Sequence, residues 1–139
     1  MGLYALAAGP GAETAAVLEA LAQDDKANPY ARAAAARSVV EADPGATVLA
    51  TLAKSYAKLP RPMCEELALT AARARQTPGA EAFFLCCIKD PRVGQRDMIV
   101  SNLLLPPTPT LIAGLKELEA DPIMAGYVKQ TIERLEQKR

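Results

Sequence analysis

Histidine and tryptophan are both absent from this chain of 139 residues. Without histidine the chain lacks the commonest general base, the usual activator of a serine or cysteine nucleophile, and the commonest metal ligand. Aromatic residues make up only 4% of the chain, and no run approaches the ~18–20 consecutive apolar residues that a membrane span requires. We therefore expect no enzyme, no metal or other cofactor, and no membrane span.

Cysteine is also scarce. Cys64, Cys86 and Cys87 are an odd number with two adjacent, which makes a poor disulfide framework. Adjacent residues of a helix point about 100° apart, so Cys86 and Cys87 also make a poor chelate. We interpret the three as small buried hydrophobes. Because segment 1–8 lacks the basic region and long apolar run of a signal peptide, we expect a reducing, cytoplasmic setting.

Net charge is absent too, because 16 lysines and arginines balance 16 aspartates and glutamates. A strongly basic domain would favour nucleic acid or anionic lipid as the partner. This balance makes nucleic acid an unlikely partner and favours a protein or peptide.

What the chain does contain is a repeat. Pro-Gly-Ala occurs at positions 10–12, 44–46 and 78–80, spaced by 34 residues each time. A second series of proline pairs lies between these copies, spaced by 33, 29 and 31 residues: Asn28-Pro29, Arg61-Pro62, Asp90-Pro91 and Asp121-Pro122. Periods in this range predict stacked supersecondary units.

Alanine and leucine carry most of the apolar weight, and alanine is the best helix former. No segment alternates apolar and polar residues for long enough to predict a strand. The pattern predicts an all-α fold of about four antiparallel helix pairs, with helices at about 12–22, 28–42, 45–58, 63–76, 79–89, 92–105, 110–120 and 123–138.

Proline marks the boundaries of these helices, because an interior proline costs about 3 kcal/mol. At Asn28-Pro29 we expect the asparagine to cap the helix and the proline to occupy its first position. The same start is expected at five further pairs: Asp43-Pro44, Thr77-Pro78, Asp90-Pro91, Thr108-Pro109 and Asp121-Pro122.

We interpret residues 1–139 as one domain with repeats at about 10–43, 44–77, 78–108 and 109–139. Segment 1–9 aligns with the end of a second helix and is either a partial repeat or a short apolar cap. A partial repeat would leave the first helix incompletely covered. Self-association would then be expected through residues of this first part of the chain: Leu3, Tyr4, Leu6, Val17 or Leu21.

The second helix of each predicted pair follows one of the prolines 29, 62, 91 and 122. Aligning the four second helices on these prolines separates a buried face from an exposed one. Offsets of 2, 6, 9, 10 and 13 from proline trace the buried face. Asp97 is its exception, and it requires either a partner such as Arg92 or Arg96, a backbone N–H, or a local shift in register. The polar residues of the opposite face, taken with Arg96, are the candidate partner-binding residues: Arg37, Glu66, Thr70, Arg73, Gln95, Arg96, Asn102 and Gln130.

Segment 28–36, Asn-Pro-Tyr-Ala-Arg-Ala-Ala-Ala-Ala, preceded by Val-Leu-Glu-Ala-Leu at 17–21, resembles HEAT-like repeats, particularly the short bacterial type related to bilin-lyase subunits. Asp90-Pro91 and Asp121-Pro122 match the turn of that motif but lack its arginine three residues after proline. The resemblance implies an α-solenoid, a HEAT-like superhelix whose second helices line one continuous partner-binding face.

Tetratricopeptide repeats are the rival family, since 34 is also their period and Leu52, Tyr56 and Asp43-Pro44 fit their pattern. Against them, the glycine and large aromatic of that motif have no counterparts in the other repeats, and the spacing falls to 29 and 31.

We therefore expect a non-catalytic protein–protein interaction scaffold or adaptor. Two alternatives remain. One is binding to a nucleic-acid backbone through Arg37, Arg73 and Arg96, and the other is an accessory domain of a larger enzyme such as a bilin-lyase-like complex.

Overall fold

A computed structural model describes residues 11–137, with side chains from residue 14 onward. Within this range the chain forms eight α-helices and two 3-10 turns, without strands. The α-helices are α2 (Gly11–Gln23), α3 (Pro29–Ala42), α4 (Val48–Lys54), α5 (Arg61–Arg73), α6 (Ala80–Lys89), α7 (Arg96–Ser101), α8 (Pro109–Glu117) and α9 (Ala125–Gln137), and the 3-10 turns are η1 (Tyr56–Lys58) and η2 (Leu118–Ala120). The all-α prediction is confirmed. No helix of this part of the chain has the length and apolar character needed to cross a bilayer.

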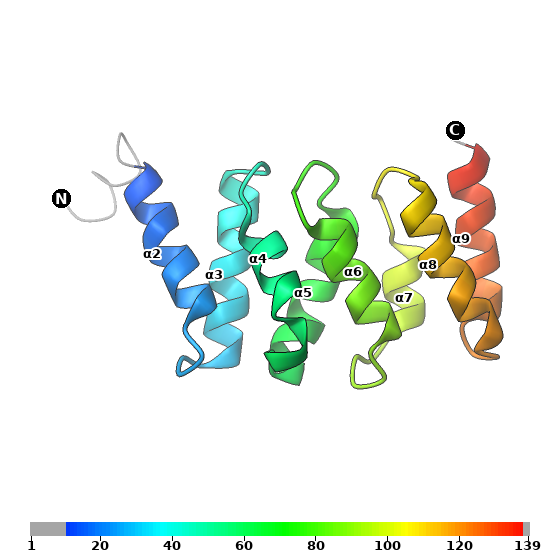
Figure 1. Ribbon diagram of the computed structural model, residues 1–139, viewed down its shortest axis with the longest axis horizontal. Helices are drawn as coiled ribbons and strands as arrows, with labels where there is room; N and C mark the ends of the chain where they lie inside the picture. Colours follow the sequence, from blue (N-terminus) through cyan, green and yellow to red (C-terminus); the bar gives the residue numbers. More distant parts are fainter. Residues whose placement is uncertain (1–10, 138–139) are drawn as a thin grey trace.

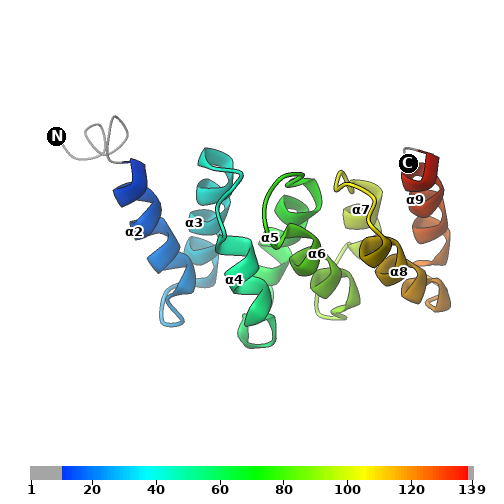
Figure 2. The same ribbon diagram turned by 45° about the horizontal axis from the view of Figure 1, so that its top comes forward.

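The helices are arranged in two layers (Figures 1 and 2). The first layer holds α2, α4, α6 and α8, each packed against the next, and the second layer holds α3, α5, α7 and α9 in the same way. Contacts such as α2 with α3, α5 with α6 and α8 with α9 join the layers. Helices α2 and α9 therefore lie at opposite ends of an elongated molecule (Figure 1).

The interior between the layers is built mainly from small side chains near α3 and α5. Ala33, Ala36, Ala68, Ala71 and Ala72 are completely buried, and small residues at a contact permit short distances between helix axes. Larger side chains fill the centre around α4 and α6, where Leu49, Leu52, Phe83 and Phe84 are completely buried. The ring of Tyr56 packs edge-on against Phe83 with the ring centroids 5.4 Å apart.

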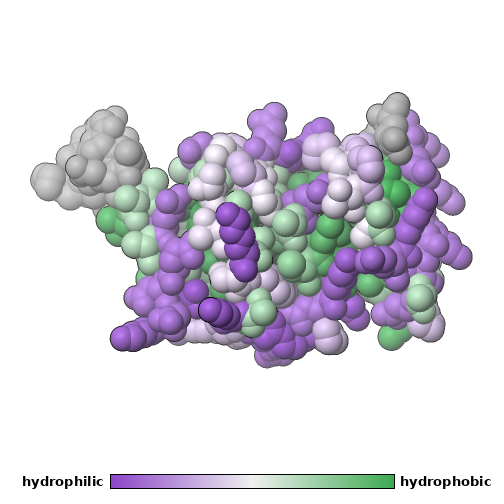
Figure 3. Space-filling view, in the orientation of Figure 1, coloured by the Kyte–Doolittle hydropathy of each residue, from purple (hydrophilic) through white to green (hydrophobic). Residues whose placement is uncertain are grey.

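The outer surface of the first layer is mixed in character. Figure 3, in the orientation of Figure 1, shows hydrophilic residues along the lower and right edges, with paler and apolar residues across the middle. Val17 of α2 is 66% exposed, and Leu21 of the same helix is partly buried against the core. Leu3, Tyr4, Leu6 and the proposed partial repeat at 1–9 lie outside the described residues.

Two of the six expected proline starts are helix caps. The Asn28 side chain accepts hydrogen bonds from the backbone N–H groups of Tyr30 and Ala31, and Thr108 Oγ1 accepts one from Leu111 N. The expectation was wrong at the other four pairs, whose prolines lie in turns before their helices begin.

The three aspartates of those four pairs show why. The carboxylates of Asp43, Asp90 and Asp121 accept from the backbone N–H two residues further on, at 2.9–3.0 Å. This local bond closes a turn around the proline and competes with helix initiation at that point. Proline still marks boundaries, because no proline of the described residues lies inside a helix beyond its second position.

The helix predicted at 92–105 is much shorter in the structure. Residues 91–94 form turns and bends, α7 begins only at Arg96, and it ends at Ser101. Beyond this helix the backbone N–H of Leu104 donates to Ala72 O of α5 at 2.8 Å, and two prolines follow at positions 106 and 107. Helix α4 is shorter than predicted for the same kind of reason, because the Asp43 turn delays its start to Val48.

The predicted buried face of the second helices is largely correct. Cys64, Ala68, Val93, Val100 and Val128 are buried as expected. Ala31, Ser38 and Ser101 are exposed instead, and Asp97 is half-buried in the first turn of α7. Of the explanations considered for Asp97, the local shift in register fits best, because the short α7 buries Ile99 and Val100 instead of Asp97.

Several arginines of the second layer hold helix ends in place. Arg32 Nε donates to Ala22 O at the end of α2, at 3.0 Å, and Arg96 donates to Ile88 O at the end of α6, at 2.8 Å. Arg134 of α9 reaches Ser101 O and Leu103 O at the end of α7. These guanidinium groups satisfy carbonyls that lack intrahelical donors. Arg96 therefore binds the end of a first-layer helix as Arg32 does, although Arg32 stands three residues after its proline and Arg96 stands five residues after its own.

Gly79, the glycine of the third Pro-Gly-Ala copy, provides a test of this packing. Its φ is +81°, and a Cβ atom there would lie 2.2 Å from Ala50 Cα. We expect Gly79→Ala to lower the free energy of unfolding by roughly 2–4 kcal/mol, from left-handed backbone strain and steric overlap. Urea unfolding followed by circular dichroism measures this.

Gly126→Ala is the matched control, because a Cβ at Gly126 meets nothing within 4 Å. It should leave stability unchanged or raise it by up to about 1 kcal/mol, as expected for Gly to Ala in a helix. Equal stability of the Gly79 variant and the wild type would contradict the close approach of the two segments.

Candidate functional site

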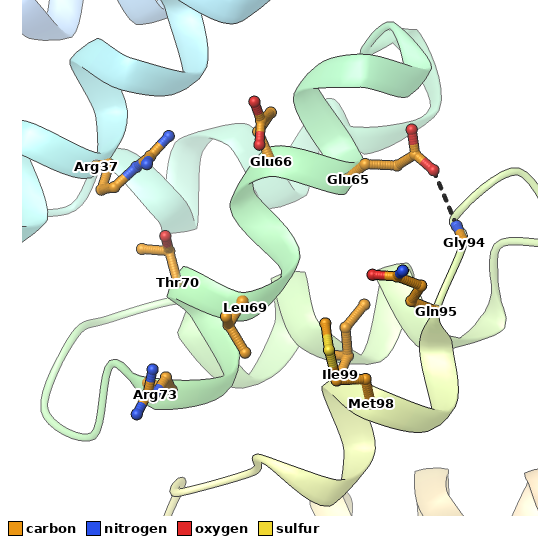
Figure 4. Close-up of a pocket in the computed structure, with 10 residues that line it drawn as sticks. All are labelled: Arg37, Glu65, Glu66, Leu69, Thr70, Arg73, Gly94, Gln95, Met98 and Ile99. Atoms are coloured by element: carbon orange, nitrogen blue, oxygen red, sulfur yellow. Dashed lines mark hydrogen bonds between the residues drawn. The ribbon is translucent and has the colours of Figure 1, made fainter.

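A groove of about 670 Å³ lies on the second layer between α3, α5 and α7. Figure 4 shows that half of its lining comes from α5, with one side chain from α3 and the rest from α7 and the loop before it. The lining residues are Arg37, Glu65, Glu66, Leu69, Thr70, Arg73, Gly94, Gln95, Met98 and Ile99.

Helical periodicity explains why α5 contributes so much. Its positions 63, 64, 67, 68, 71 and 72 are buried in the core, whereas positions 65, 66, 69, 70 and 73 line the groove. The two sets alternate with the period of an amphipathic helix. Since α3 and α7 lie on either side of α5, the outward stripe of α5 forms the floor between them.

The groove has an apolar part and two kinds of charge. Leu69 of α5 faces Met98 and Ile99 of α7 (Figure 4), and Met98 is 44% exposed. Thr70 lies between Arg37 and Arg73 in the same view. Glu65 and Glu66, on the first turns of α5, supply the opposite charge. A surface of this kind offers both an apolar contact and directional polar contacts.

The acidic end of the groove is held by the protein itself. Glu65 Oε2 accepts a hydrogen bond from Gly94 N at 2.9 Å, and its Oε1 lies 3.7 Å from Arg61 Nε. Gln95 follows with φ of +57°, the only non-glycine residue with positive φ among the described residues. A left-handed residue of this kind costs about 1–2 kcal/mol, and here it directs the chain into α7.

The two arginines of the groove are less engaged. Within residues 14–137 neither Arg37 nor Arg73 belongs to an ion pair. Arg37 Nε is buried without a hydrogen-bond partner in that part of the chain, so only the outer end of its guanidinium faces the groove. An unsatisfied donor of this kind is costly, on the order of 1–3 kcal/mol.

Of the eight predicted partner-binding residues, the structure brings five together in this groove: Arg37, Glu66, Thr70, Arg73 and Gln95. The other three lie outside its lining. Arg96 donates to Ile88 O and lies near Asp121, the Asn102 side chain donates to Met98 O, and Gln130 is exposed on α9.

Sequence reasoning missed Glu65, Leu69, Gly94, Met98 and Ile99. Glu65 and Leu69 stand one position before predicted residues on α5, so a wider exposed stripe would have included them. Met98 and Ile99 are apolar, and they were omitted because only the polar residues of the exposed face were taken as candidates.

A second hollow, of about 600 Å³, adjoins the groove at Arg73. It lies beyond the end of α5, against the end of α3 and the loop near Pro106. Its lining residues are Val40, Glu41, Pro44, Arg73, Ala74, Arg75, Gln76, Thr77 and Pro106.

A polar cluster lies on the other side of α5. Asp90 accepts hydrogen bonds from Tyr56 OH at 2.8 Å and from Arg92, whose NH2 lies 2.9 Å from Asp90 Oδ2. The Arg92 hydrogen bonds lower the pKa of Asp90 to about 2 against the opposing effect of burial. Burial, followed by contacts with Cys64, Cys87 and Asp90, raises the pKa of Tyr56. The cluster links segments 34 residues apart and is a structural tie.

The surroundings of the three cysteines disfavour their thiolate forms. Cys64 and Cys87 are buried, Cys86 is partly buried, and all three are free thiols. Burial raises the pKa of each, so the reactive thiolate is disfavoured at neutral pH. Across the described residues no three histidine, cysteine or acidic side chains gather as metal ligands would.

Comparison of the chain with protein-family models, with curated proteins and with solved structures gives no match. The groove between α3, α5 and α7 is therefore the basis for a functional proposal.

The Asp90 cluster predicts how stability depends on pH. A carboxyl whose pKa falls from 3.8 unfolded to about 2 folded stabilises the fold above pH ~4, and that contribution disappears as pH falls from ~4 to ~2. Asp90→Asn should therefore lower the free energy of unfolding at pH 7 by roughly 2 kcal/mol. The difference from wild type should shrink below pH 4, become small near pH 2 and vanish below it.

Chemical unfolding at a series of pH values measures this difference. Asp25→Asn is the control, because Asp25 is exposed in the turn after α2, and its stability should follow that of wild type. A constant gap between wild type and the Asp90 variant from pH 7 to pH 2 would show that the charge of Asp90 contributes nothing.

Proposed function

We propose that this chain is a HEAT-like α-solenoid segment that binds a protein or peptide along its second-helix layer and does not catalyse a reaction. The observation that carries the proposal is the groove between α3, α5 and α7. Its exposed apolar contact, formed with Leu69 and Met98, lies beside polar and charged side chains. Protein interfaces combine an apolar centre with a polar rim, and methionine and arginine are enriched in them.

The arrangement of the helices supports the solenoid part of the proposal. Helices of one layer pack against the next helix of the same layer, and pairs that are adjacent in the chain are adjacent in space. In solenoids each unit rests on its neighbours. A contact that recurs in two units gives further support, since Arg32 on Ala22 O and Arg96 on Ile88 O serve the same end of two first-layer helices, α2 and α6.

The charges of the groove favour a protein partner over a nucleic-acid backbone. Glu65 and Glu66 would repel phosphates from the same groove that holds Arg37 and Arg73. The third arginine of the nucleic-acid alternative, Arg96, already donates to Ile88 O and lies 3.7 Å from Asp121 Oδ2. A phosphate-binding surface would require a denser set of available cations.

We further propose a reducing, cytoplasmic location. The three cysteines are free thiols, two of them buried, and none is paired in a disulfide. Secreted domains of this size commonly use cysteines for disulfides.

Selection from a random peptide library tests the proposed function. Dodecapeptides displayed on phage are selected on the immobilised full chain, and the selected sequences are synthesised and measured by fluorescence anisotropy. Met98→Glu should weaken their binding by about tenfold, because it removes an apolar contact worth about 1.4 kcal/mol and adds a third acid to the groove.

Tyr127→Glu is the matched control. Tyr127 is 43% exposed, close to the 44% of Met98, and each is the third residue of its helix. Binding by this variant should stay within about twofold of wild type. If no peptide is selected, or if both variants weaken binding equally, the groove is not a binding site and the proposed function fails.

A further inference from the structure

The two hollows on the second layer form one trough along α5. They share Arg73 and together follow the chain from Glu65 to Thr77. The part of this span within α5, from Glu65 to Arg73, is on the order of 12 Å long, because a helix rises about 1.5 Å per residue. At about 3.3 Å per residue, roughly four residues of extended peptide would match that helical part. The trough therefore has room for a short linear segment.

Charge is distributed unevenly along the trough. Glu65 and Glu66 lie at the end where α5 begins, and the apolar contact of Leu69 with Met98 and Ile99 follows. Arg37 and Arg73 come next, and Arg75 lines the second hollow with Glu41 as the acid there. An occupant that meets the apolar part thus has arginine on one side and glutamate on the other.

Within residues 14–137, the arginines of the trough differ from the other arginines of this layer in having no carboxylate or carbonyl partner. Arg32, Arg96 and Arg134 each donate to a backbone carbonyl, and Arg92 binds Asp90. By contrast, no side-chain hydrogen bond or ion pair of Arg37 or Arg73 is found within the described residues. Their charges are therefore available to an external anion.

We propose that the occupant of the trough is a short peptide segment that pairs an aliphatic side chain with an adjacent acidic side chain. The aliphatic group rests on Leu69, Met98 and Ile99, and the carboxylate meets the guanidinium groups of Arg37 and Arg73 on either side of Thr70. This rests on the proposed function and specifies its partner. A guanidinium binds a carboxylate through directed N–H donors, which suits one acid at a defined distance from an apolar anchor.

The alternatives fit the same residues less well. A basic peptide would bring like charges together at Arg37 and Arg73, which opposes binding. A continuous phosphate backbone would pass Glu65 and Glu66 at the other end. A purely apolar peptide would leave the two arginines desolvated without a counter-charge, and such burial is unfavourable.

The peptides selected on the wild-type chain test this proposal in two ways: by their amino-acid composition, and by how their affinity depends on the charges of Arg37, Arg73 and the peptide's acid. We expect aspartate or glutamate to be enriched within one or two positions of leucine, isoleucine, valine or methionine. Arg37→Gln/Arg73→Gln should weaken binding at low salt by at least about tenfold, as should replacing the peptide's acid by its amide. The two changes combined should cost less than the product of their separate effects, because they remove the same interaction.

Lys54→Gln/Lys129→Gln is the control for net charge, since it also removes two positive charges from exposed helix positions. Its affinity should stay within about twofold of wild type. Arg73→Gln alone is the second variant, because Arg73 is exposed while Arg37 Nε is buried. Thermal unfolding of each variant identifies any loss of folded protein.

The outcomes separate this inference from the proposed function. Two results would overturn the acidic partner and leave the binding groove in place. One is that the selected peptides lack acids. The other is that their affinity is unchanged by the Arg37 and Arg73 substitutions while Met98→Glu abolishes binding. Duplex DNA that displaces the selected peptides in an arginine-dependent manner would overturn it in favour of a phosphate backbone. Absence of any Met98-dependent peptide would remove both proposals.

Discussion

Close approach between helices is the constraint on which the rest of this structure depends. Five alanines of α3 and α5 are completely buried, and Gly79 approaches Ala50 so closely that no side chain fits between them. With so few aromatic residues, the chain fills its interior by shortening the distances between helices. The two layers, and the groove on one of them, follow from that packing, since α3 and α7 must lie beside α5 to form its walls.

Short distances between backbones leave polar groups that water cannot easily reach, and arginine supplies many of the missing bonds. Arg32, Arg96 and Arg134 each satisfy carbonyls at the end of a neighbouring helix. Asp90, held by Arg92 and Tyr56, ties a first-layer helix end to the preceding unit. The bonds of Arg32 and Arg96 join the two helices of one unit, whereas those of Arg134 and the Tyr56–Asp90 bond join consecutive units. Together they stabilise the stack beyond what apolar burial supplies. They also divide the arginines into a structural set and an available set.

The available set is what gives the groove its proposed chemistry. Arg37 and Arg73 stand on the outward side of the second layer, and within residues 14–137 neither belongs to an ion pair. Their neighbours are Thr70, the apolar Leu69 and Met98, and two glutamates nearer the start of α5. The proposed protein or peptide partner would meet this combination with an apolar anchor and an acidic group of its own.

The helical class, most helix positions and the outward stripe of α5 could be read from the sequence, because periodicity and proline placement act over a few residues. The same local reasoning named Arg37, Thr70 and Arg73 correctly as neighbours on one layer. It failed at α7, where an aspartate turn, a left-handed Gln95 and a backbone bond from Leu104 to Ala72 shorten the helix. Only the tertiary structure decided which arginines bind carbonyls or carboxylates of the protein itself. It also decided whether the exposed faces of α3, α5 and α7 meet as one groove. Both depend on distances between segments about 30 residues apart, and those distances are set by packing.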